Sequence, residues 1–336
     1  MDERLAMDIQ VIKTLEEGIP LVTEPFKEMA QGLGITEAEF IDTLRRLKTD
    51  RIVRQISPIY ETRMLGYKSS LVAFKAEENQ IEHAAGVINS YPGVSHNYLR
   101  DHDFNLWFTI AVPPDSGYGL TETVRLIAER AGVKQYMLLE SKTIFKIGVK
   151  LARRSEINDK EEVTTSGKVF SPLDDTDKRV IRVTQVDIPL VSRPFAHFAE
   201  TAQMDEAELI GKLKDLLRRG VIRRYAAVLY HRNVGFSANG MVVWAVAPEL
   251  LQETGRKMAS YMAVSHCYER SVTEMWRYSL FTMIHARSTQ ELQQIVDTIS
   301  RETGVSNYQI LYSTREFKKV RPKYFTDDYY QWEKVI

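Results

Sequence analysis

Apolar positions near the start of the chain recur with the period of an α-helix. The first apolar stripe occupies positions i, i+3, i+4 and i+7 and consists of Phe26, Met29, Ala30 and Leu33. Gly34 interrupts this stripe, and a second stripe follows it with Phe40, Leu44 and Leu47. Two short amphipathic helices joined by a turn predict a helix-turn-helix segment.

After Gly66 the pattern changes to alternating strands and helices. An apolar strand at 71–74 precedes a helix whose apolar face carries Ile81, Ala84, Ala85 and Ile88. Two strands around His96 and Trp107 follow, then a helix and a last strand at 135–147. The order βαββαβ predicts a ferredoxin-like domain, so the fold class is α+β.

The second half of the chain repeats the first. Ile19-Pro20-Leu21-Val22 recurs as Ile188-Pro189-Leu190-Val191, an offset of 188 − 19 = 169 residues. After one inserted residue, Ser95-His96 recurs as Ser265-His266. The chain is therefore expected to be a tandem duplication of a winged helix-turn-helix and a βαββαβ domain.

The stretch between the copies is polar and predicts an exposed linker. The expected helix-turn-helix domains cover 1–66 and 171–235, the βαββαβ domains 67–152 and 236–323, the linker 153–170, and an aromatic tail 324–336. The tail has no counterpart after the first copy, and we expect it to dock on another domain. The two copies predict an internal pseudo-heterodimer, with a possible homodimer of whole chains.

Composition excludes several classes of protein. The 336 residues carry 45 basic and 45 acidic side chains, a formal net charge of +0, which argues against a general electrostatic nucleic-acid binder. No apolar run approaches the ~18 residues of a membrane span, and the start lacks the layout of a signal peptide. We expect a soluble, cytoplasmic protein without membrane partners. The single cysteine, Cys267, excludes an internal disulfide and an all-cysteine metal site.

Each copy carries a row of three polar side chains on a predicted strand. Because residues i, i+2 and i+4 of a strand share one face, each row is expected to project together. The rows are His96, Tyr98 and Arg100 in the first copy and His266, Tyr268 and Arg270 in the second. The helices of a βαββαβ domain cover one face of its sheet, so the rows could line a cleft on the other face.

The order of domains resembles the Lrp/AsnC architecture, and the motifs that contain these rows carry a sharper resemblance. His96-Asn97-Tyr98-Leu99-Arg100 leading into Trp107-Phe108-Thr109, with its counterpart at 265–282, resembles the two subunits of the siroheme decarboxylases fused in one chain. The resemblance implies an enzyme, a carboxy-lyase that removes two acetate carboxyl groups from siroheme. The product would be 12,18-didecarboxysiroheme, on a route to heme or heme d1.

The residue types suit this chemistry. Guanidinium groups bind carboxylates in bidentate geometry, so Arg100 and Arg270 are candidate substrate anchors. His96 or His266 could ligate the iron of the bound tetrapyrrole or act as the general acid, and the sequence leaves both roles open. Tyr98 and Tyr268 would orient the acid. We expect no cofactor beyond the iron tetrapyrrole itself.

Two further residues have competing interpretations, and two others have a single expected role. His102 is either a substrate-binding residue or part of a polar hairpin tip. Trp107 either packs in the core or stacks on the macrocycle. Cys267 alternates with His266 and is expected to face the core. His285 is expected to be an ordinary strand residue.

The helix-turn-helix favours a rival function. A DNA-reading helix would begin with basic or amide side chains, whereas these begin with Thr36-Glu37-Ala38-Glu39 and Asp205-Glu206-Ala207-Glu208. Acidic residues suit a helix N-terminus, so we interpret them as caps and expect no DNA binding. The alternatives are an Lrp/AsnC-like transcription regulator and a non-catalytic heme sensor or carrier.

The second copy also has the longer insertion at 271–277, which predicts functional asymmetry.

Overall fold

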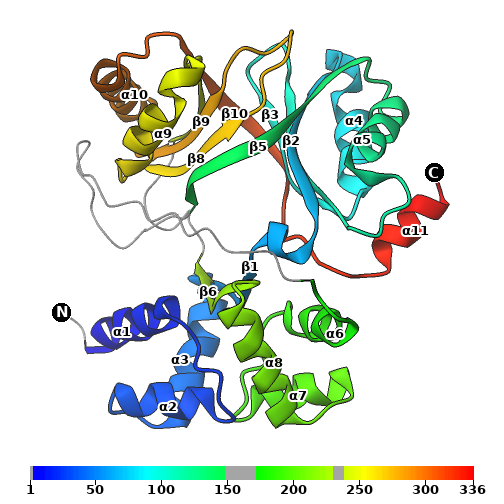
Figure 1. Ribbon diagram of the computed structural model, residues 1–336. Helices are drawn as coiled ribbons and strands as arrows, with labels where there is room; N and C mark the ends of the chain where they lie inside the picture. The colour runs from blue at the N-terminus through cyan, green and yellow to red at the C-terminus, as the bar shows by residue number, and fades with distance from the viewer. Residues whose placement is uncertain (1–2, 148–171, 230–237) are drawn as a thin grey trace. The chain divides into compact units, whose positions relative to one another are not determined.

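The computed structural model describes residues 3–147, 172–229 and 238–336, which form two compact units (Figure 1). The helical unit contains the described parts of 1–67 and 168–230 together with Lys323–Asp327. The barrel unit contains the described parts of 68–167 and 231–322 together with Asp328–Ile336. Like domains of the two copies therefore join each other, and the expected tail divides between the units. The expected linker lies outside the described residues.

Among the described residues of the helical unit, each copy contributes three α-helices and one strand. The first copy supplies α1 (Glu3–Glu17), α2 (Pro25–Gly32), α3 (Glu37–Thr49) and β1 (Val53–Tyr60); the second supplies α6 (Asp175–Thr184), α7 (Pro194–Ala202), α8 (Glu206–Arg218) and β6 (Ile222–Leu229). The predicted helix-turn-helix is confirmed, with α2 ending before Gly34. Gly34 adopts a left-handed φ of 71°, and its counterpart at the 169-residue offset, Gln203, has a φ of 55°.

The strand after each helix-turn-helix pairs with its counterpart in the other copy. β1 and β6 are antiparallel, with Ile56 opposite Ala227. Neither copy forms a wing hairpin among the described residues, although a wing was expected there. The two helix-turn-helix segments are thus joined through a shared two-stranded sheet.

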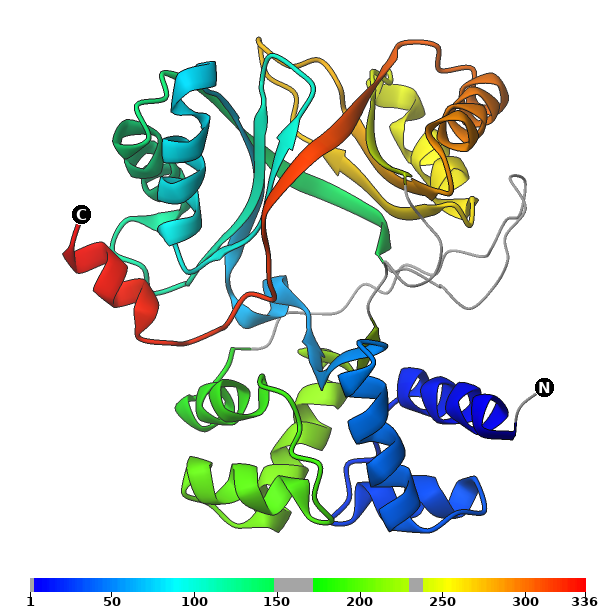
Figure 2. The same cartoon turned by 180° about the vertical axis from the view of Figure 1, so that it is seen from behind.

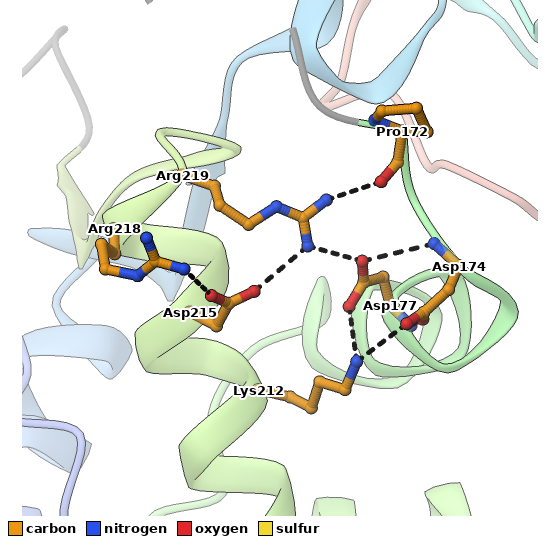
Figure 3. Close-up of polar contacts among 7 residues, drawn as sticks. All are labelled: Pro172, Asp174, Asp177, Lys212, Asp215, Arg218 and Arg219. Carbon is orange, nitrogen blue, oxygen red and sulfur yellow. Dashed lines mark hydrogen bonds and ion pairs between the residues drawn. The ribbon is translucent and has the colours of Figure 1, made fainter. Parts of the chain in front are cut away.

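A buried carboxylate organises the second helix-turn-helix (Figure 3). Asp177 on α6 is 1% exposed and accepts from Lys212 Nζ at 3.1 Å and from Arg219 Nη1 at 2.7 Å. In the first copy the equivalent Asp8 binds Arg46 through both carboxylate oxygens. At the 169-residue offset, Arg46 corresponds to Asp215. The basic partners of the carboxylate in the second copy therefore lie at other positions of the chain than in the first.

The barrel unit consists of two ferredoxin-like sheets closed into one barrel. The first copy supplies β2 (Lys68–Lys75), α4 (Ile81–Ser90), β3 (Val94–Arg100), β4 (Leu106–Val112), α5 (Gly119–Arg130) and β5 (Gln135–Ile147); the second supplies β7 (Ala238–Trp244), α9 (Leu251–Ser260), β8 (Val264–Arg270), β9 (Leu280–Ala286), α10 (Thr289–Thr303) and β10 (Tyr308–Lys319). The predicted βαββαβ order and the strand at 135–147 are confirmed.

The long strands β5 and β10 close the barrel. The strand order is β10-β3-β4-β2-β5-β8-β9-β7, so β5 pairs with β2 of its own copy and β8 of the other, while β10 pairs with β7 and β3. Helices α4 and α5 cover one side of the barrel and α9 and α10 the other (Figure 2). Each sheet is therefore completed by a strand of the other copy.

Apolar side chains from both copies fill part of the barrel interior. We call this set the barrel core: Leu71, Ala73, Phe104, Trp107, Met137, Leu139, Met241, Val243, Trp276, Tyr278, Phe281 and Leu311. The alternate residues of the same strands, such as Val72 and Val242, are buried toward the helices. The period of two along each strand thus separates an inner from an outer core.

The aromatic residues after β10 serve both units. In the helical unit, Tyr324 and Phe325 lie against Tyr67 with ring centroids at 5.1 and 5.3 Å. In the barrel unit, α11 (Asp328–Lys334) packs Trp332 on Tyr91 with ring centroids at 4.7 Å. The expected docking of this segment is confirmed within each unit.

Candidate active site

Each polar row lies on one face of its strand, as the sequence predicts. On β3 the His96 and Tyr98 rings stack at 6.2 Å, and the Arg100 guanidinium lies 5.5 Å from the Tyr98 ring centroid. On β8 the His266 and Tyr268 rings stack at 6.1 Å, and Arg270 lies 4.8 Å from the Tyr268 ring. Both copies therefore present the same ordered set of imidazole, phenol and guanidinium.

The intervening residues show that both rows face the barrel interior. Asn97 donates to Asn89 Oδ1 on α4 at 3.0 Å, and Cys267 Sγ lies 3.5 Å from the Gly255 carbonyl on α9. These side chains point to the helices, so their neighbours along the strand point inward. The prediction that Cys267 faces the core is confirmed. Burial raises the pKa of its thiol, which keeps it from acting as a nucleophile.

The two arginines join the copies. Arg100 Nη1 donates to the Leu311 carbonyl on β10 at 2.7 Å, and Arg270 Nη1 donates to the Leu139 carbonyl on β5 at 2.8 Å. Both side chains are buried. Burial lowers the pKa of Arg100 to about 10, so its guanidinium stays charged at neutral pH. Each arginine therefore holds the strand that the other copy contributes.

A β-bulge precedes each histidine and brings in a serine that the sequence argument missed. The register shifts between Val94 and His96 on β3 and between Val264 and His266 on β8. A bulge breaks the alternation of side chains, which allows sequence neighbours to meet. Ser95 Oγ lies 2.9 Å from His96 Nδ1, and Ser265 Oγ lies 2.9 Å from His266 Nδ1. The repeated Ser-His pair was the available signal.

His102 lies at a different place from the histidines of the two rows. It follows β3 in the turn before β4, six residues after His96, and its amide donates to the Arg100 carbonyl at 2.9 Å. It borders a hollow of about 330 Å³ lined by His102, Asp103, Phe104, Glu274, Met275, Trp276, Arg277, Tyr278 and Gln309. Its ring lies 5.6 Å from Trp276, and its Nδ1 accepts from the Phe104 amide at 3.0 Å. The insertion of the second copy thus forms one wall of this hollow.

Trp107 is part of the barrel core. Its side chain is 1% exposed, its Nε1 donates to the Phe104 carbonyl at 2.6 Å, and its ring lies 5.3 Å from Trp276. This placement favours core packing, one of the two alternatives that the sequence left open. The roles of all the candidate residues in binding and catalysis stay predictions.

The described residues hold no group of three or more His, Cys, Asp or Glu side chains suited to a metal ion. Within the same parts of the chain, none of the helices is both long and apolar enough to cross a membrane.

Two family patterns match the chain twice each. The AsnC-like ligand binding domain matches residues 64–146 and 233–318, and the siroheme decarboxylase NirDL-like HTH domain matches 8–54 and 177–223. Fold and site therefore define a duplicated protein of the Lrp/AsnC-like class with an inward-facing row of polar residues in each copy.

Relatives of nearly the same length identify the family. A siroheme decarboxylase of Hydrogenobacter thermophilus is 48% identical over 97% of both chains. A crystal structure of the siroheme decarboxylase NirDL is 42% identical, with a TM-score of 0.81 and coverage of 98% of this chain and 97% of that one. The siroheme decarboxylase beta subunit of Methanosarcina barkeri is 40% identical, and 97% of it matches 44% of this chain. The chain belongs to the siroheme decarboxylase family, and the relatives favour catalysis over regulation of transcription.

Proposed function

We propose that the chain removes two acetate carboxyl groups from siroheme to give 12,18-didecarboxysiroheme, for heme or heme d1 synthesis. The family membership supports a decarboxylase, and a NirDL crystal structure in complex with an iron-uroporphyrin III analogue, 42% identical with a TM-score of 0.81, supports an iron tetrapyrrole as its ligand. The observation that carries the proposal is the pair of His-Tyr-Arg rows that face one interior from the two copies.

In the proposed chemistry, a proton replaces the carboxylate of each acetate. The bond between the methylene carbon and the carboxylate breaks, CO2 leaves, and its bonding electrons pass into the macrocycle of the substrate. One proton then replaces the lost carboxylate, so that the acetate becomes a methyl group. An imidazole can hold that proton near neutral pH, so His96 and His266 are the proposed acids or iron ligands, oriented by Tyr98 and Tyr268.

The remaining candidates have proposed binding roles. Arg100 and Arg270 are charged groups on the same face as the acids and are proposed carboxylate anchors, in addition to their bonds between the copies. His102, at the hollow beyond β3, is proposed to bind an outer carboxylate, and Trp107 to support this region through Trp276. The proposal needs no cofactor beyond the substrate.

The helix-turn-helix segments are proposed to be structural, without a DNA partner. Thr36 and Glu39 form a capping box at the start of α3, and Ser192 of the second copy donates to Glu37 at 2.9 Å. These acidic side chains would repel phosphates. We further propose a cytoplasmic protein whose copies act as a pseudo-heterodimer, and leave a homodimer of whole chains to measurement of its mass in solution.

The test is anaerobic incubation of the purified chain with siroheme, followed by mass analysis of the extracted tetrapyrrole. We expect loss of one and then two CO2. Siroheme that stays bound and unchanged would replace the proposal with a sensor or carrier. Absence of binding, together with sequence-specific retention of genomic DNA fragments, would replace it with a regulator.

A further inference from the structure

The neighbourhood of the serine beside each histidine differs between the copies. In the second copy, Ser265 Oγ contacts three groups: His266 Nδ1 at 2.9 Å, His285 Nε2 at 2.9 Å and the Met283 carbonyl, to which it donates at 3.2 Å. In the first copy, Ser95 Oγ contacts His96 Nδ1 at 2.9 Å and Thr109 Oγ1 at 2.7 Å.

The register identifies which residues correspond. Thr109 lies opposite His96 and Met283 lies opposite His266. Two residues further on, the Ala111 amide donates to the Gly93 carbonyl and the His285 amide to the Ala263 carbonyl. His285 therefore occupies the place of Ala111. The serine of the second copy therefore contacts a second imidazole, at a position where the first copy has only the methyl group of an alanine.

The single hydroxyl proton of Ser265 limits where the two imidazole rings can carry their protons. A hydroxyl has one proton to donate and two lone pairs that accept. When Ser265 donates to the Met283 carbonyl, both ring nitrogens must bring their own proton, so His266 carries its proton on Nδ1 and His285 carries its proton on Nε2. The Nε2 atom of His266 then keeps a lone pair. The Ser265 side chain is 3% exposed, so water competes little for these bonds.

We infer that His285 is a positioning residue, which acts through Ser265 to fix the tautomer and orientation of His266. The first copy lacks this device, because Ser95 contacts the hydroxyl of Thr109 and no second imidazole. The two histidines of the proposed acid pair are therefore held by different partners. The inference deepens the proposed function and rests on it for the role of His266.

The direct test is nitrogen-15 NMR on the whole chain, labelled at the histidine rings and recorded at about pH 8, where the two ring nitrogens of a neutral imidazole report its tautomer. We expect His266 in a single tautomer with its proton on Nδ1. His285→Gln keeps an N–H donor for Ser265 and should preserve this tautomer, whereas His285→Ala and Ser265→Ala should each give a mixture of tautomers. His96 is an internal control, and Ser95→Ala is the matched variant of the first copy.

Kinetics supply the second readout. In the siroheme assay, His285→Ala should lower kcat about tenfold with little change in KM, and His285→Gln should restore part of the loss, as expected for a residue that acts through another. Adding Ser265→Ala to His285→Ala should lower kcat no further. A tautomer of His266 that is unchanged in both His285→Ala and Ser265→Ala would overturn the inference. A single tautomer that these variants disturb, in a protein that does not decarboxylate siroheme, would keep the positioning role and reject the proposed function instead.

Discussion

The ring of Phe145 occupies the space that a β-carbon on Gly255 would need. Phe145 belongs to β5 of the first copy and Gly255 to α9 of the second, and a β-carbon built on Gly255 would lie 2.4 Å from the ring. The equivalent helix residue of the first copy is Ala85, which is buried, whereas the next residue, Gly86, has open space around it. The barrel is therefore packed differently on its two sides.

This contact predicts opposite effects for two alanine substitutions. Gly255→Ala should destabilise the protein by about 2 kcal/mol, because the ring must move within a packed core. Gly86→Ala should stabilise it by about 0.5–1 kcal/mol, since alanine favours an exposed helix interior. Urea unfolding measures both. Equal effects at the two positions would contradict the observed packing.

A second matched pair concerns the turn after α2 and α7. Gln203→Gly should stabilise the helical unit by about 1 kcal/mol, because glycine adopts the left-handed conformation that glutamine adopts there at a cost. Gly34→Ala should destabilise it by a similar amount. The measurement is the free energy of unfolding by urea, followed by circular dichroism. A loss of stability in Gln203→Gly would show that contacts of the glutamine side chain outweigh the backbone cost.

Asp177→Asn should cost about 3 kcal/mol, because it leaves Lys212 and Arg219 without the buried carboxylate that they share. The control is Asp42→Asn on α3, whose ion pair with Arg45 is exposed and should be worth little. Thermal unfolding of both variants compares them directly. A loss in Asp177→Asn no larger than that of the control would mean that the network does not stabilise α6 on α8.

Stability should fall in acid. The hydrogen bonds from Arg46 lower the pKa of Asp8, and the Asp177 amide followed by Lys212 lowers the pKa of Asp174. A carboxyl with a lowered folded-state pKa stabilises the fold above its unfolded pKa of about 4 and loses this contribution as the pH falls through the folded value. Urea midpoints between pH 7 and pH 3 measure the slope. The urea midpoint of Asp8→Asn should be lower at pH 7 and should fall less on acidification. A slope equal to that of the unmodified protein would mean that Asp8 does not contribute to the loss of stability in acid.

Substitution of the two buried arginines separates their roles. Arg100→Ala and Arg270→Ala should each destabilise the barrel by about 2 kcal/mol, because the carbonyl of Leu311 or Leu139 loses a charged donor. Lysine at either position should restore part of this stability. Tetrapyrrole binding is measured on the same folded variants. If the variants lose tetrapyrrole binding but keep their stability, the arginines anchor the ligand. Their hydrogen bonds between the copies then do not stabilise the barrel.

Periodicity and repetition in the sequence were sufficient to predict much of the fold. The offset between Ile19 and Ile188 predicted two equivalent copies, and the apolar pattern predicted the strand 135–147 with the bounds of β5. The exchange of β5 and β10 between the copies was not predicted, because strand pairing over such distances leaves no local signal. The one sign of it in the sequence was the length of β5, 13 residues, compared with seven residues in β3 and β4 of the same copy.

The candidate site was predicted only where strand alternation holds. Alternation placed His96, Tyr98 and Arg100 on one face, and the ring contacts agree. Alternation alone would place Ser265 on the face opposite His266, and the bulge at this point of β8 breaks the alternation. His285 received no role for the same reason, since its link to His266 passes through the bulged serine.

The closed strand order has a consequence for how the two halves can diverge. Two separate polypeptides with this architecture could each close a barrel with a second copy of themselves, and such pairs would carry two histidines at the position of His285 or none. Covalent fusion guarantees one half of each kind in every barrel. Selection can then act on each half alone, and a change such as alanine to histidine at one position need never be tolerated in duplicate.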